Sequence, residues 1–91
     1  MPKLSLTQIK AGLAELPEWE KKGDKLIRTF QFKDFPAALR FVNAVGRLAE
    51  KHSHHPDIDI RWNKVTLALT THDEGGLTKK DFDLAKKFDQ L

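Results

Sequence analysis

The sequence predicts an α+β fold in which three helices pack on one face of a four-stranded antiparallel sheet. Two short turn sequences each separate a pair of strand-like stretches, which is typical of β-hairpins. Three further stretches place apolar residues at helical spacing and begin with a capping residue. The predicted order is helix, strand, strand, helix, strand, strand, helix, with residues 1–91 forming a single domain.

The first helix is predicted from the residues that cap it. Ser5 and Gln8 match an S-x-x-Q capping box. Pro17 ends the helix, because the residue before a proline avoids helical geometry. Gly23, followed by an aspartate, then suits the turn of a hairpin whose second strand covers residues 26–32.

The second helix is expected from about Phe35 to His52, with Asp34 as its N-cap. The stripe expected to cover the sheet consists of Phe35, Ala38, Leu39, Val42, Val45 and Ala49. A second stripe beside it consists of Phe41, Ala44 and Leu48. This second stripe needs another apolar surface, either the first helix or, most economically, another subunit. We therefore expect a homodimer or homotetramer.

The second hairpin is predicted from two runs of alternating apolar residues. These are Ile58, Ile60 and Trp62 in one strand and Val65, Leu67 and Leu69 in the other. Asn63 and Lys64 lie between the runs and suit a two-residue turn, since Asn tolerates positive φ. This turn sets Trp62 opposite Val65, and the same register, continued outward, sets His55 opposite His72.

The third helix is expected to begin after Thr78. This residue and Asp81 match a T-x-x-D capping box, which alone is sufficient to explain Asp81. The two glycines before it, Gly75 and Gly76, either end the strand or allow the backbone to approach a ligand closely.

Composition narrows the classes of function. The chain lacks cysteine and therefore has no disulfide framework, which is typical of proteins in a reducing compartment. Its first residues lack the apolar run of a signal peptide. Its net charge of +3 is spread along the chain without a nucleic-acid-binding motif. We expect a cytoplasmic protein that binds neither membranes nor nucleic acid directly.

All four histidines lie between Glu50 and Asp81, and the second hairpin brings His54, His55 and His72 to one end of the sheet. Three explanations are open: chance decoration of a loop, acid–base chemistry or a metal site. Histidine exchanges protons near neutral pH, which favours acid–base chemistry. A zinc site is less favoured, because adjacent histidines usually point apart and no thiolate is present.

Several motifs in this region resemble one protein family. They are H-H-P, N-K-V, T-T-H and G-G-L-T with a following Asp, preceded upstream by L-P-x-W and F-x-F-K-D-F. Together they resemble the pterin-4a-carbinolamine dehydratase family over nearly the whole chain from about Leu6. The sequence departs from the family pattern at Ser53, where some members carry an acidic residue, and at Trp62, where tyrosine is common.

The resemblance implies dehydration of 4a-hydroxytetrahydrobiopterin to quinonoid dihydropterin, in tetrahydrobiopterin recycling and without metal or cofactor. It implies His54, His55 and His72 as catalytic residues; we expect His54 and His72 to transfer protons and His55 mainly to bind. The residues expected to hold the substrate are Trp19, Glu50, Pro56, Thr71 and Asp81. Trp19 is equally well explained as a core residue.

The family also implies partners. A pterin-dependent hydroxylase would act in the same pathway. Because relatives serve as dimerisation partners of a transcription factor, a protein-binding module is the alternative function.

Overall fold

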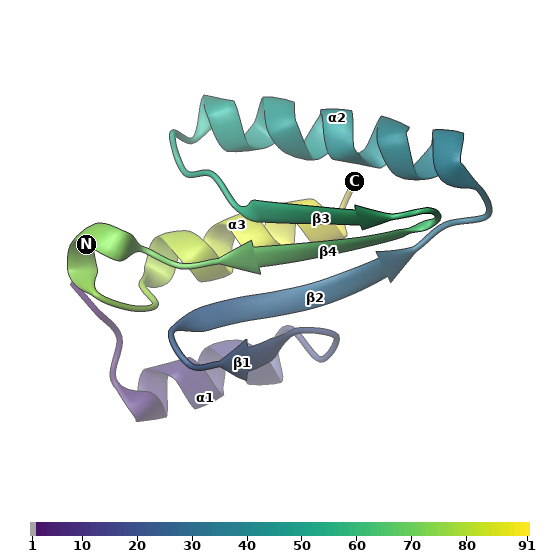
Figure 1. Ribbon diagram of the computed structural model, residues 1–91. Helices are drawn as coiled ribbons and strands as arrows, with labels where there is room; N and C mark the ends of the chain where they lie inside the picture. Colours follow the sequence, from purple (N-terminus) through teal and green to yellow (C-terminus); the bar gives the residue numbers. More distant parts are fainter. Residues whose placement is uncertain (1) are drawn as a thin grey trace.

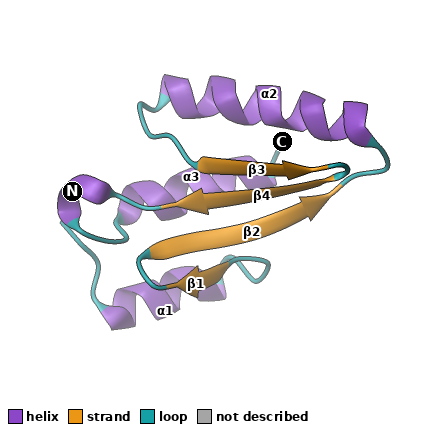
Figure 2. Cartoon of the chain, in the orientation of Figure 1, coloured by secondary structure: helices purple, strands orange, loops and turns teal. Residues whose placement is uncertain are grey.

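The computed structural model describes residues 2–91 and contains three helices and four strands (Figure 1). In chain order the elements are α1 (Leu6–Ala14), β1 (Glu20–Lys22), β2 (Lys25–Gln31), α2 (Phe35–Lys51), β3 (Asp57–Arg61), β4 (Lys64–Leu69), the short 3₁₀ turn η1 (His72–Glu74) and α3 (Lys79–Asp89). The strands form one antiparallel sheet in the order β1-β2-β4-β3 (Figure 2). The predicted α+β fold and element order are confirmed.

The core lies between the sheet and the three helices. The fully buried residues of the two central strands are Leu26 in β2 and Val65, Leu67 and Leu69 in β4. Residues in alternate positions point to the other, uncovered face, where the hydroxyls of Thr29 and Thr66 lie 2.8 Å apart. The sheet is therefore apolar on one face and polar on the other. No helix among residues 2–91 is long and apolar enough to cross a membrane.

The capping box of α1 is confirmed. The Ser5 N–H donates to Gln8 Oε1 at 2.8 Å, and the Gln8 N–H donates to Ser5 Oγ at 3.2 Å. Further along, α1 lies so close to α3 that a Cβ on Gly12 would stand 2.6 Å from the Phe82 ring. Glycine at this position permits the two helices to pack.

The two apolar stripes of α2 match the prediction in part: Ala38, Val45 and Ala49 of the stripe expected to cover the sheet are buried. Phe41 is only 8% exposed, and its ring centroid lies 4.6 Å from that of Phe30 and 4.9 Å from that of Phe32. Phe35 and Leu39 are instead 43% and 38% exposed. For Phe41, the prediction that this stripe faces another subunit is therefore wrong, because its ring packs in the core. The inward face of α2 therefore combines most of the first stripe with Phe41 of the second, because the aromatic rings of β2 lie against Phe41.

The turn of the second hairpin also differs from the prediction. It lies at Trp62 and Asn63, so that Arg61 pairs with Lys64 and Ile60 with Val65. The Asn63 side chain explains the shift: it donates to the Phe32 carbonyl at 2.8 Å, while the Phe32 N–H donates to the Asn63 carbonyl at 2.8 Å. The positive φ falls on Trp62, at +50°. The strand register differs from the predicted one by two residues, so each side chain keeps its predicted face.

Pairing in this hairpin stops before it reaches the histidines. β3 begins at Asp57 and β4 ends at Leu69, and His72 starts the turn η1. The predicted pairing of His55 with His72 is therefore wrong, although both still lie at the same end of the sheet.

β3 is an edge strand and stays partly uncovered. Five exposed apolar residues result on α2 and the hairpin: Phe35, Leu39, Ile58, Ile60 and Trp62.

Candidate active site

The end of α2 determines where the first two histidines lie. His52 is the C-cap, and Ser53 follows in the left-handed region with φ +51°. The Ser53 N–H donates to the Glu50 carbonyl and the His54 N–H to the Ala49 carbonyl, both at 3.1 Å. These two bonds form a Schellman motif, which usually has glycine at the position of Ser53. The motif stops the helix abruptly and turns the chain back, so that His54 reaches α3.

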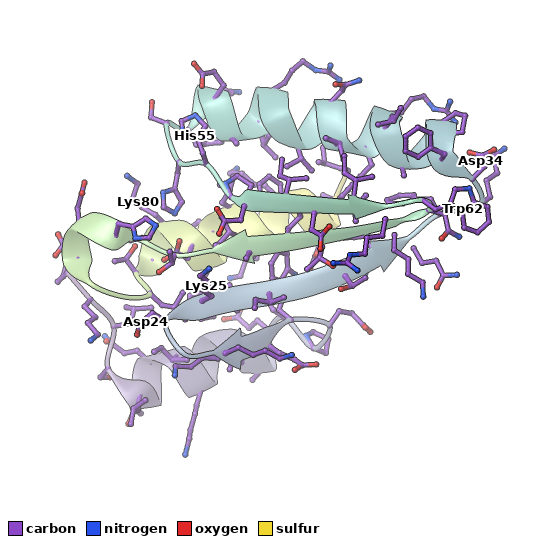
Figure 3. The ribbon with its side chains drawn as sticks, viewed as in Figure 1. Asp24, Lys25, Asp34, His55, Trp62 and Lys80 are labelled. Atoms are coloured by element: carbon purple, nitrogen blue, oxygen red, sulfur yellow. The ribbon has the colours of Figure 1, made fainter. Side chains whose placement is uncertain are left out.

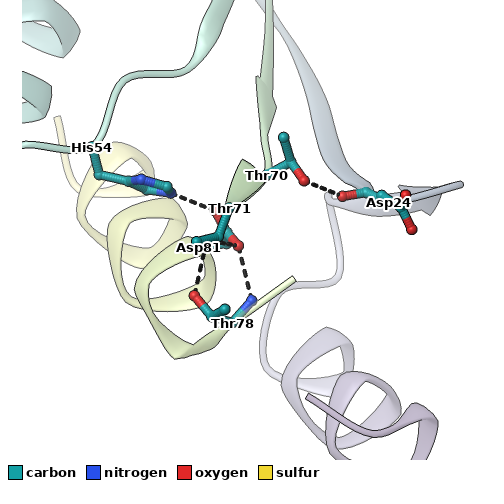
Figure 4. Close-up of polar contacts among 6 residues, drawn as sticks. All are labelled: Asp24, His54, Thr70, Thr71, Thr78 and Asp81. Atoms are coloured by element: carbon teal, nitrogen blue, oxygen red, sulfur yellow. Dashed lines mark hydrogen bonds and ion pairs between the residues drawn. The ribbon is translucent and has the colours of Figure 1, made fainter. Parts of the chain in front are cut away.

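His54 is anchored on a buried carboxylate. Its Nε2 lies 2.5 Å from Oδ1 of Asp81, a residue of the first turn of α3 that is completely buried. The other oxygen, Oδ2, accepts from the Thr71 hydroxyl at 2.8 Å and from the Thr78 N–H at 2.9 Å (Figure 4). The hydroxyls of Thr71 and Thr78 are themselves 2.9 Å apart. Every polar side-chain atom of Asp81, Thr71 and Thr78 therefore has a partner.

This arrangement favours one tautomer of His54. With Oδ2 of Asp81 occupied by two donors, Oδ1 is the natural acceptor for a proton on Nε2 of His54. The second ring nitrogen, Nδ1, has no hydrogen-bond partner among residues 2–91. It is therefore the nitrogen that can exchange a proton with a bound molecule.

His55 is held differently, on the outside of the molecule. Its Nε2 lies 2.8 Å from Oε1 of Glu50, in the last turn of α2. Both side chains are exposed, so this pair contributes little to stability. The contact sets the direction of the His55 imidazole, and Glu50 itself lies outside the cavity lining. In Figure 3, His55 lies at the end of the molecule opposite Trp62.

A cavity of about 340 Å³ lies between these histidines and the end of β4. Its lining residues are Ser53, His54, His55, Thr70, Thr71, His72, Asp73 and Lys80. The volume falls in the range of small-molecule sites. The structure therefore brings together the three histidines predicted to be catalytic and adds Thr71 to them. We call this space the histidine cavity.

The remaining predicted site residues lie outside the lining of this cavity. Glu50 and Asp81 contact its histidines, and Pro56 links His55 to β3. Trp19 is buried in the core, edge-on to Phe30, and its indole N–H donates to Asp89 at 2.9 Å. Of the two explanations for Trp19, its position supports the core residue.

Two residues of the candidate site were not recognised from the sequence. Lys80 lines the cavity, although no motif in the sequence singles it out. Thr78 was predicted as a helix cap, but it also supports the Asp81 carboxylate. The T-x-x-D capping box already linked Thr78 to Asp81 in the sequence, whereas the position of Lys80 depends on how α3 packs.

The side chains do not group as metal ligands. Across residues 2–91, no set of three or more His, Cys, Asp or Glu side chains is placed to share a metal ion. Nε2 of His54 is already hydrogen-bonded to the Asp81 carboxylate. That the protein works without metal stays a prediction.

Comparison with known sequences identifies relatives of this chain. The family model described as pterin 4 alpha carbinolamine dehydratase matches residues 2–91. A protein of Chloroflexus aurantiacus (strain J-10-fl), provisionally named pterin-4-alpha-carbinolamine dehydratase, is 54% identical over 91 residues, covering 100% of this chain and 98% of the relative. A protein of Picosynechococcus (strain PCC 7002) with the same provisional name is 56% identical over 89 residues, covering 98% and 97%.

Two solved structures share the fold of this chain. A crystal structure from Brucella melitensis, described as a transcriptional coactivator/pterin dehydratase, superposes with a TM-score of 0.93 at 33% identity, covering 97% of this chain and 96% of that one. A pterin dehydratase-like RuBisCO assembly factor of the alpha-carboxysome shares the fold, with a TM-score of 0.67 at 22% identity over 79% of this chain and 83% of that one. With its α+β fold, histidine cavity and full-length match, the chain belongs to the pterin 4 alpha carbinolamine dehydratase family.

Proposed function

We propose that the protein dehydrates a pterin 4a-carbinolamine, 4a-hydroxytetrahydrobiopterin or a close relative, by histidine acid–base catalysis. The observation that carries this proposal is one cavity lined by three histidines, of which His54 is fixed on a buried carboxylate. Family membership supports the class of reaction. The product, quinonoid dihydropterin, would return to the tetrahydrobiopterin pool, and a pterin-dependent hydroxylase would supply the substrate.

The chemistry requires one base and one acid. The base removes the proton from N5, the electron pair forms the N5–C4a double bond, and the C4a–O bond breaks. The acid protonates the departing oxygen, so that water leaves instead of hydroxide. No electrons pass to another molecule, and the balance needs no cofactor.

We assign the base to His54 and the acid to His72. When Nδ1 of His54 accepts a proton, the Asp81 carboxylate on Nε2 stabilises the imidazolium that forms. His72 lines the same cavity from η1 and is exposed, which lets it exchange protons with solvent between turnovers. His55, oriented by Glu50, is left to bind the substrate.

The test is an absorbance assay of carbinolamine breakdown with the purified protein. We expect the wild type to exceed the rate in buffer, and His54→Ala or His72→Ala to lower kcat by about 10²–10⁴-fold, the usual scale of acid–base help. His55→Ala should act mainly on KM. Circular dichroism confirms that each variant is folded. A wild-type rate equal to that in buffer would reject the enzyme proposal.

The same assay tests whether the activity depends on a metal ion. After treatment with a chelator and dialysis, we expect full activity, since proton transfer alone is sufficient. Loss of activity that zinc restores would instead assign the histidines to a metal centre.

A second candidate is a protein-binding role, as dimerisation cofactor of a transcription regulator. The exposed apolar residues of α2 and the hairpin favour it. The Brucella melitensis neighbour is described as a coactivator as well as a dehydratase. A protein that fails to accelerate the dehydration, yet loses a partner when these residues are made polar, would belong to this class.

A further inference from the structure

A second, smaller cavity adjoins the histidine cavity. It measures about 110 Å³, and its lining residues are His52, His54, Lys80, Asp83, Leu84 and Lys87. His54 and Lys80 line both spaces, so the two cavities share a wall. Lys80 lies at the end of the molecule where His55 is found (Figure 3). The smaller cavity therefore begins at the His54 ring, directly beside the space of the histidine cavity.

The smaller cavity carries unbalanced positive charge. Lys80 and Lys87 form no ion pair within residues 2–91, whereas their neighbours do: Lys79 lies 4.0 Å from Asp83, and Lys86 lies 3.3 Å from Glu15. Asp83, the one carboxylate of the lining, is shared with Lys79 at 4.0 Å and offsets only part of this charge. Two lysines against one carboxylate leave the lining with an excess of positive charge. Unpaired cations that converge on one space are suited to an anion.

The helix geometry makes this convergence specific. Lys80, Leu84 and Lys87 are spaced four and three residues apart, which places them on one face of α3. Lys80 stands in the first turn of α3, where the helix dipole disfavours a cation that lacks a counter-ion. Leu84 is buried and shields one side of the cavity from water. Shielding from water strengthens the attraction between charges.

We propose that this cavity holds an anionic group on the side chain of the pterin, so that the enzyme acts on pterins with a phosphorylated or carboxylated C6 substituent. The inference rests on the proposed function, in which His54 removes the proton from N5. C6 is the ring atom bonded to N5, so its substituent must leave the ring beside His54. The smaller cavity begins at that residue, and its lysines supply the positive charge.

Two substrates test the proposal. One is a carbinolamine with an uncharged C6 side chain, and the other is the same compound with a phosphate ester on that side chain. At low ionic strength we expect KM about tenfold lower for the phosphorylated substrate, and we expect added salt to reduce this preference. Lys87→Gln should remove most of the preference, because it deletes one of the two unpaired cations. Lys86→Gln is the matched control: it removes the same charge from a lysine that is paired with Glu15 and lines neither cavity.

A binding measurement separates this inference from the proposed function. Inorganic phosphate, titrated at constant ionic strength, should shift the ring-proton NMR signals of His52 and His54 to saturation in wild type and Lys86→Gln. The shift should be much weaker in Lys87→Gln. Equal KM values for the two substrates, or equal phosphate titrations in the two lysine variants, would overturn the proposal. If neither pterin is dehydrated, the proposed function fails, and the phosphate titration still decides whether the cavity binds an anion.

Discussion

The Thr71 hydroxyl supports the carboxylate that anchors His54. It donates to Oδ2 of Asp81, the completely buried residue that holds His54. A buried carboxylate that loses a donor is destabilised by about 1–3 kcal/mol. Thr71→Val should therefore lower both stability and kcat, the latter about tenfold, whereas Thr71→Ser should restore both. Urea unfolding and the carbinolamine assay measure the two effects.

A readout specific to positioning accompanies this prediction. The Nε2 proton of His54, held on Asp81, should give a downfield NMR signal in the wild type and in Thr71→Ser. In Thr71→Val the signal should broaden or disappear. If Val and Ser behave alike in all three measurements, the hydroxyl has no part in orienting His54.

The site residues were predictable to different degrees. His54, His55 and His72 were predictable because they lie in one short region of the sequence. The predicted strand register was wrong by two residues, but this error left all three at the same end of the sheet. Asp81 was recognised as a helix cap because capping is local in sequence. Lys80 and the orientation of Trp19 depend on how α3 and the core pack, which a local pattern does not record.

At the scale of elements, the contact between α1 and α3 depends on a missing side chain. Gly12→Ala would place a methyl group 2.6 Å from the Phe82 ring, and we expect a loss of about 1–3 kcal/mol in the free energy of unfolding. Gly46→Ala in α2 is the matched control, since nothing lies within 4 Å of its added Cβ. It should gain about 0.5–1 kcal/mol, because Ala favours helix. A gain in both variants, measured by urea unfolding, would mean that the helices separate easily.

The elements themselves were largely predictable. Ser5, Asp34 and Thr78 each precede a helix in the structure, as their capping patterns indicate. The hairpin turn was misplaced because Asn63 bonds to Phe32, a residue distant in sequence. Phe41 was assigned to the outward stripe of α2 for the same kind of reason: its partners lie on another element.

At the scale of the whole molecule, we propose that the chain forms a homodimer or homotetramer through its exposed apolar residues. Leu39→Asp or Ile60→Asp should then lower the mass found by sedimentation, while the protomer stays folded. Gln31→Asp, exposed on β2, is the control and should leave the mass unchanged. Phe41→Asp should instead unfold the protein, because Phe41 is in the core. A wild-type mass of one chain, 10.4 kDa, at micromolar concentration would contradict this proposal.

The Asp81 carboxylate serves two structures at once: it accepts the Thr78 N–H at the start of α3, and it holds the ring of His54. Helix ends open more often than sheets do, without global unfolding. Each time the first turn of α3 opens, the histidine loses its anchor although the sheet remains intact. The histidine cavity can therefore be taken apart by the opening of one helical turn, without unfolding of the sheet.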